Sequence, residues 1–91
     1  MLKLHWSNQA ETDLLKIVDY ISDHSLIAAQ RLIDDIEFAA SQIPEHPFLY
    51  RIGSVQGTRE LVVSPNYILV YRITMDAVEI LAVLHTRQLY P

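Results

Sequence analysis

Residues 58–85 read TRELVVSPNYILVYRITMDAVEILAVLH, and this stretch decides the fold. It contains three runs rich in Val, Ile, Leu and Tyr, at 58–63, 67–74 and 78–85. Such runs are typical of strands, and the SPN and MDA segments between them carry turn-forming residues. Because these connections are short, the three strands are predicted to form an antiparallel meander.

The residues before the meander predict one short strand and two helices. Apolar and polar residues alternate over 2–6, which is the pattern of a half-buried strand. Apolar residues then recur at helical spacing over 8–23 and again over 26–43. The segment 44–57 contains two prolines and two glycines and is predicted to be a loop.

Polar residues and a proline mark the ends of the two helices. Ser7 or Asn8 offers a side-chain oxygen for the N-cap of the first helix, and Ser25 does so for the second. Pro44 ends the second helix, because the residue before a proline is disfavoured in the helical region. The short connection predicts that the helices form an antiparallel hairpin.

The element order is therefore β-α-α-β-β-β, an α+β fold in a single domain that spans residues 1–91. We expect the helical hairpin to pack on one face of a small, mainly antiparallel sheet of four strands. The strand over 2–6 should lie beside a later strand, because its apolar side chains would otherwise lack a partner. The helix side of the core is predicted to consist of Leu14, Ile17, Ile21, Leu32, Ile36 and Ala40.

The last two strands carry apolar residues on both faces. Ile68 and Val70 share one face with Arg72, and strict alternation in the next strand predicts a second apolar face with Leu81 and Val83. Two helices cannot cover both faces of a sheet. An exposed apolar face on a small domain is typical of an interaction site, so this second face is predicted to bind a partner. The alternative is an ordinary closed core in which a loop covers this face.

Composition excludes several classes of protein. The chain has 91 residues, of which 51% are hydrophobic, and this fraction excludes intrinsic disorder. It has no cysteine, two glycines and four dispersed histidines. We therefore expect no disulfide scaffold, no metal site and no cofactor. No apolar run reaches the length of a signal peptide or a membrane span, which predicts a cytoplasmic protein. The formal net charge of −4 disfavours bulk binding to nucleic acid.

The candidate chemical groups lie in the second half of the chain. Arg59 and Arg72 are on neighbouring predicted strands, and the C-terminal segment carries His85, Arg87 and Tyr90. An imidazole or phenol that moves a proton, with an arginine that stabilises phosphoryl charge, could cleave RNA. The alternative is ordinary ion pairing of these cations with Glu60 or Glu79 across the sheet, together with terminal packing.

Four segments, in order, resemble motifs of the RelE/ParE superfamily of bacterial toxins from type II toxin–antitoxin modules. They are IPEHP at 43–47, GTREL at 57–61, YILVYR at 67–72 and VEILAVLH at 78–85. The resemblance covers residues 2–91 and is nearer to ParE, in which Gly-x-Arg-Glu-Leu, Tyr-Arg and a final Val-Leu-His are typical.

The resemblance implies a growth inhibitor, encoded on a chromosome or a stabilised plasmid, that a cognate antitoxin neutralises. The antitoxin would cover Ile68, Val70, Leu81 and Val83, and operator DNA would be contacted only through it. ParE-like members act on DNA gyrase and trap its cleaved DNA complex, whereas RelE-like members are ribosome-dependent mRNA endoribonucleases. An inactive or regulatory homologue is a third possibility.

Two positions favour the gyrase inhibitor. RelE-type nucleases carry several basic side chains along the strand that begins at Arg59, but here the next positions on that face are Leu61 and Val63. Aliphatic side chains cannot bind phosphate, and an acidic protein is repelled by ribosomal RNA. The resemblance thus implies a target surface at Arg59, Arg72, His85 and Arg87; a ribonuclease would instead use Arg59, His85, Arg87 and Tyr90.

Overall fold

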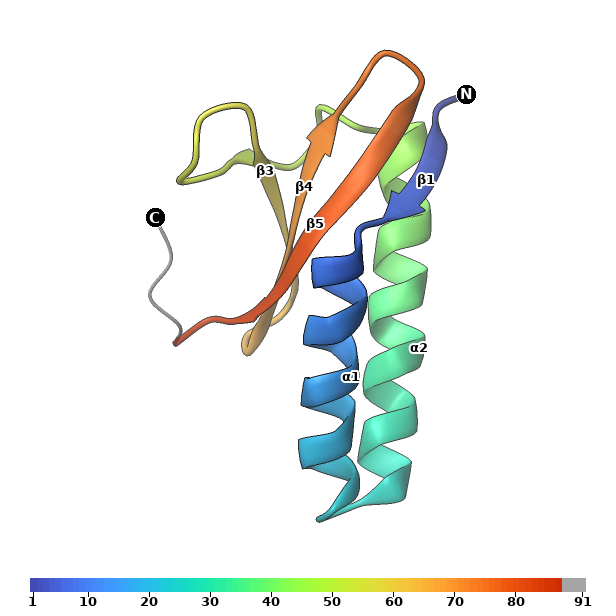
Figure 1. Ribbon diagram of the computed structural model, residues 1–91, viewed down its shortest axis with the longest axis vertical. Helices are drawn as coiled ribbons and strands as arrows, with labels where there is room; N and C mark the ends of the chain where they lie inside the picture. Colours follow the sequence, from blue (N-terminus) through green and yellow to red (C-terminus); the bar gives the residue numbers. More distant parts are fainter. Residues whose placement is uncertain (88–91) are drawn as a thin grey trace.

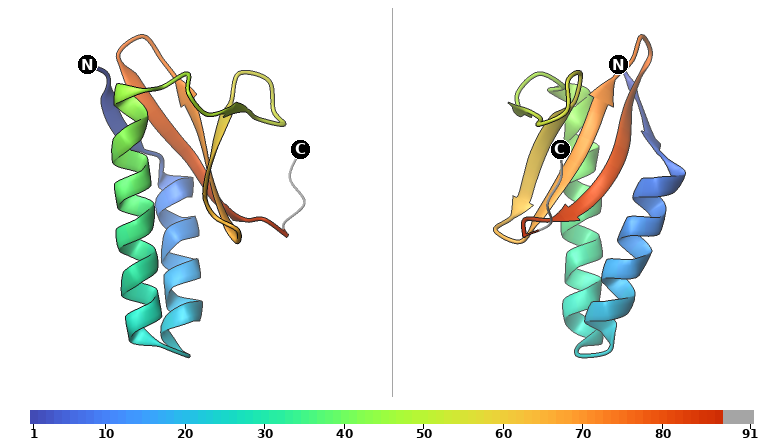
Figure 2. Two further views of the ribbon diagram at one scale, coloured as in Figure 1. Left: turned by 180° about the vertical axis from the view of Figure 1, so that it is seen from behind. Right: turned by 60° about the vertical axis from the view of Figure 1, so that its left-hand side comes forward.

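The computed structural model describes residues 1–87, in which a helical hairpin lies against one face of a five-stranded sheet (Figures 1 and 2). This arrangement confirms the predicted α+β fold. The elements in chain order are strand β1 (Lys3–Trp6), helices α1 (Asn8–Ser22) and α2 (Leu26–Gln42), the 3-10 helix η1 (Ile43–Glu45), and strands β2 (Arg51–Ile52), β3 (Arg59–Ser64), β4 (Tyr67–Ile73) and β5 (Ala77–His85).

The strand order across the sheet is β1-β5-β4-β3-β2. Strands β3, β4 and β5 form the predicted antiparallel meander, and β1 pairs in parallel with β5. The prediction that the first strand lies beside a later one is therefore confirmed. The parallel pairing follows from the path of the chain, because both helices intervene between β1 and the meander.

The sheet has five strands rather than the four predicted. The segment 44–57, predicted to be a loop, contains the last two residues of η1 and the two-residue strand β2, which pairs with Arg59 and Glu60 of β3. The pairing closes with a hydrogen bond from the Gly53 N–H to the Thr58 carbonyl at 2.8 Å. A Cβ at Gly53 would lie 2.3 Å from Thr58 Oγ1, so this close approach requires glycine.

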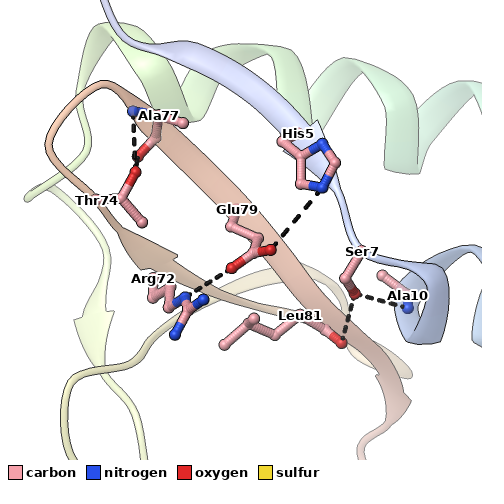
Figure 3. Close-up of polar contacts among 8 residues, drawn as sticks. All are labelled: His5, Ser7, Ala10, Arg72, Thr74, Ala77, Glu79 and Leu81. Carbon is pink, nitrogen blue, oxygen red and sulfur yellow. Dashed lines mark hydrogen bonds and ion pairs between the residues drawn. The ribbon is translucent and has the colours of Figure 1, made fainter.

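Ser7 joins helix α1 to the edge of strand β5 (Figure 3). Its side chain accepts a hydrogen bond from the Ala10 N–H as the N-cap of α1 and donates one to the Leu81 carbonyl at 3.2 Å. Asp13, one turn further along α1, accepts a hydrogen bond from the Val83 N–H at 3.0 Å. Polar groups of α1 thus bind backbone groups of β5 beyond the point where β1 ends.

Replacing Ser7 with Ala is expected to lower the free energy of unfolding by about 1–3 kcal/mol, because both the cap and the bond to β5 are lost. Ser25 is the matched control, since it caps α2 by accepting only from the Ala28 N–H. Ser25→Ala should cost about 1 kcal/mol. Urea unfolding of both variants measures the difference, and equal losses would mean that the Leu81 contact adds nothing.

The core lies between the hairpin and the near face of the sheet. Ile36 and Ala40 of α2 are fully buried, and Leu32 is 9% exposed. Leu14, Ile17 and Ile21 of α1 are partly buried and pack against the same cluster, so all six predicted helix positions contribute to the core.

The alternation predicted for β5 is wrong beyond Ile80. Val70 pairs with Ala82 while the next residue, Tyr71, pairs with Ile80, so Leu81 is an additional residue in β5. Such a bulge reverses the alternation. Val83 therefore lies in the core, 1% exposed, rather than on the second face, and Ala82 pairs with Val70 there instead.

Candidate functional site

Arg59, the first residue of β3, anchors the segment that precedes β2. Its guanidinium donates hydrogen bonds to the Phe48 carbonyl at 3.2 Å and to the Tyr50 carbonyl at 2.7 Å. The same guanidinium lies 5.2 Å from the centroid of the Phe48 ring, within the range of a cation–π interaction. The side chain is half-buried. Glu60, one possible partner in the alternative of ion pairing, is bound by Arg51 instead, at 2.8 Å.

Tyr71 holds the same segment from the middle of the core. Its ring is fully buried, and its hydroxyl donates a hydrogen bond to the Pro47 carbonyl at 2.6 Å. Burial raises the pKa of Tyr71 from 10.0 to about 12, with the Arg59 charge lowering it and Tyr50 raising it further. Arg59 and Tyr71 together fix the backbone of residues 47–50 by binding three of its carbonyl groups.

Stability should therefore depend on pH in the alkaline range. The unfolded Tyr71 ionises near pH 10.0, whereas the folded protein keeps its proton up to about pH 12. Ionisation thus favours the unfolded state, and the stability that this residue contributes below pH 10 is lost as the pH rises toward 12. The free energy of unfolding of Tyr71→Phe should fall less over this interval than that of the parent, and parallel curves would contradict the assignment.

Arg72 lies at the end of β4 on the second face and is ion-paired (Figure 3). Its Nε atom lies 2.6 Å from Glu79 Oε1, and the other oxygen of that carboxylate lies 3.9 Å from Nε2 of His5. Arg72 thus makes the cross-strand ion pair that was the alternative to a target contact. Because the Arg72 side chain is 54% exposed, it can still contact another molecule.

His85 and Arg87 lie at the other end of the sheet. The His85 ring contacts the Tyr67 ring edge-on, with centroids 5.3 Å apart, and His85 Nδ1 accepts a hydrogen bond from the Arg87 N–H. Burial, and secondarily the nearby Tyr20, raises the pKa of Tyr67. Arg87 is exposed. Tyr90, the fourth candidate for a ribonuclease, lies outside the described residues.

The structure does not bring Arg59 together with His85 and Arg87. Arg59 lies opposite Tyr71, which lies opposite Ile80, five residues before His85. At about 3.3 Å per residue, Arg59 and His85 are therefore separated by roughly 15 Å along the sheet. Within residues 1–87, no group of three or more His, Cys, Asp or Glu side chains could hold a metal ion.

The second face exposes less apolar surface than the sequence predicts. Ile68 and Leu81 are half-buried there, and Val70 is only 2% exposed. The face also carries two ion pairs, Arg51 with Glu60 and Arg72 with Glu79. Strict alternation assigns Leu84 to the core side, but the bulge at Leu81 places it on this face, opposite Ile68.

Two exposed apolar residues near the edge of the sheet were not predicted as site residues. Val62 of β3 is 48% exposed and Phe38 of α2 is 69% exposed, and both line one groove of about 400 Å³. The helical spacing of α2 could have identified Phe38, because it falls outside the apolar stripe of that helix. Alternation could likewise have identified Val62, because its neighbours Leu61 and Val63 lie on the core side of β3.

No helix among residues 1–87 is long and apolar enough to cross a membrane.

Comparison with known proteins identifies relatives over nearly the whole chain. Residues 4–90 match the model of the family described as the ParE toxin of the type II toxin–antitoxin system parDE. Toxin RelE2 of Caulobacter vibrioides is 35% identical over 89 residues, which cover 98% of this chain and 100% of that protein.

Solved structures share the fold. A chain of the chromosomal ParDE TA system from P. aeruginosa superposes with a TM-score of 0.83 at 22% identity, covering 93% of this chain and 96% of that one. A chain of the E. coli DinJ-YafQ complex superposes with a TM-score of 0.68 at 15% identity, covering 100% of both.

Proposed function

The chain belongs to the ParE toxin family of type II toxin–antitoxin systems, and from this membership we propose that it is an inhibitor of DNA gyrase, neutralised in the cytoplasm by a cognate antitoxin. It is a toxin of the RelE/ParE superfamily, whose solved relatives include chains of toxin–antitoxin systems. The relatives carry both ParE and RelE names, which fit gyrase and the ribosome respectively as the target. The choice of gyrase is our proposal.

The hydrogen bonds that Arg59 makes within the protein are the main support for the proposal. A ribonuclease of this family would need this cation at its RNA, but both of its hydrogen bonds go to backbone carbonyls of Phe48 and Tyr50. Leu61, the next residue on that face, is 6% exposed, so β3 presents no row of polar groups to RNA. His85 lies too far away to share a phosphate with Arg59.

We place the contact with the target at the exposed cations of the other strands. Arg87, at the end of β5, is exposed, and Arg72 is 54% exposed beside Glu79. Arginine can bind a carboxylate or a DNA phosphate with two parallel hydrogen bonds, which suits a protein that acts on an enzyme bound to DNA. His85, the last residue of β5, accepts a hydrogen bond from the Arg87 N–H and would orient the segment that carries Arg87.

We place the antitoxin on the second face of the sheet. Ile68 and Leu81 offer half-buried apolar surface there, with Val70 beneath them, and Leu84 replaces Val83 in the predicted set. Covering partly exposed apolar side chains with a partner is favourable because it removes them from water.

One toxin preparation should be tested in two assays. The proposal predicts inhibition of supercoiling by purified gyrase and intact mRNA on translating ribosomes. Cleavage of mRNA with unaffected supercoiling would establish the ribonuclease instead. Inactivity in both assays, with antitoxin binding retained, would identify an inactive regulatory homologue.

A further inference from the structure

Strand β3 has an open edge along half of its length. Its partner β2 pairs only with Arg59 and Glu60, and no other strand of residues 1–87 lies on that side (Figure 2). Thr58 and Glu60 direct their backbone groups toward β2, as the Gly53–Thr58 hydrogen bond and the Arg51–Glu60 pairing show. Since this direction alternates along a strand, the N–H and C=O of Val62 point to the same edge, beyond the end of β2.

An apolar groove runs beside this edge. Phe38, Ala39 and Gln42 of α2 line one side, and Leu61, Val62 and Val63 of β3 line the other. Phe38 is 69% exposed and Val62 is 48% exposed, on opposite sides of the sheet edge. A strand added along β3 would point alternate side chains toward Phe38 and toward Val62, so both of its faces would meet apolar surface.

One carboxylate also lies beside the groove. Asp35 lines it, is exposed, and makes no hydrogen bond or ion pair with any residue of the described chain. Asp34, the adjacent residue on α2, instead accepts a hydrogen bond from Gln30. An unpaired carboxylate beside an apolar groove favours a cationic occupant and disfavours a second copy of this chain, which would bring another Asp35 to the same place.

We propose that the open edge of β3 binds an extended segment of the antitoxin, with apolar side chains on both faces and a lysine or arginine opposite Asp35. The segment adds a short strand where β2 ends, and its backbone binds the N–H and C=O of Val62. The register shift between Val62 and Ser64 limits the added strand to a few residues. This inference rests on the proposed antitoxin partner, but it does not depend on whether gyrase is the target.

Amide hydrogen exchange in the unmodified toxin tests the backbone contact. The probe is the full-length antitoxin encoded by the reading frame next to this gene, added to isotopically labelled toxin. The Val62 N–H should exchange rapidly in the free toxin and at least tenfold more slowly in the complex. Formation of the complex without protection of Val62 would overturn the inference and leave the antitoxin partner intact. If no complex forms, the proposed neutralisation itself fails.

Matched variants test the side chains. Asp35→Lys should weaken binding of this antitoxin about tenfold or more, whereas Asp34→Lys makes the same charge change one residue away and should weaken it less than about threefold. Phe38→Ala should likewise weaken binding about tenfold, with Leu26→Ala, exposed at the other end of α2, as its control. Equal effects within either pair would overturn the inference. A toxin dimer that Phe38→Ala dissociates would instead identify a second copy as the occupant.

Discussion

Replacing Ile36 with Ala is expected to lower the free energy of unfolding by about 2–5 kcal/mol. Ile36 is fully buried in α2 and packs in the cluster between the hairpin and the sheet, where the smaller side chain leaves a cavity. For a domain of this size the total is about 5–15 kcal/mol, so the variant should be close to unfolding at physiological temperature. Urea unfolding measures the change.

Ile27 provides the control for this prediction. It lies on the same helix and is 68% exposed, so Ile27→Ala makes the same chemical change with little buried surface lost. Its effect should stay within about 0.5 kcal/mol. Similar losses in the two variants would mean that α2 does not pack against the sheet through Ile36.

Replacing Arg87 with Gln is expected to raise the toxin concentration needed for half-inhibition of gyrase about 10- to 100-fold. The loss of a charge-assisted contact costs about 1.5–3 kcal/mol, and each 1.4 kcal/mol is a factor of ten. Arg87 is exposed at the end of β5, so the melting temperature should be unchanged. Supercoiling assays over a range of toxin concentrations, with thermal unfolding of the same preparation, measure both quantities.

Arg59→Gln should give the opposite result. Its guanidinium binds two backbone carbonyls and stacks on Phe48, so the substitution should lower the free energy of unfolding by about 1.5–3 kcal/mol. At a temperature where the variant stays folded, its activity should remain near that of the parent. An Arg59 variant that is stable and inactive, beside an active Arg87 variant, would move the target surface to the start of β3.

The meander and the helical hairpin could be predicted because their signals are local. The periodicity of Ile36 and Ala40, the caps at Ser7 and Ser25, and the short turns between the strands each depend on neighbours in sequence. Secondary-structure propensity, hydrophobic pattern and helix capping agree in these segments, and such agreement allows a fold to be predicted from its sequence.

Three features could not be predicted, because each depends on contacts between distant residues. Strand β2 has only two residues and forms because Glu60 and Arg59 pair with it. The bulge at Leu81 leaves no signal in an apolar run, yet it moves Val83 into the core. The role of Arg59 depends on the carbonyl groups of Phe48 and Tyr50, which its position in a strand does not indicate.

Trapping of cleaved DNA by gyrase is the most direct assay of gyrase inhibition by this toxin. Circular plasmid is incubated with purified gyrase, ATP and the toxin, and the enzyme is then denatured and digested. We expect linear plasmid that increases with toxin concentration, does not form without gyrase, and requires about 10- to 100-fold more of the Arg87→Gln variant. Absence of linear plasmid, with cleavage of mRNA by the same preparation on translating ribosomes, would contradict gyrase inhibition.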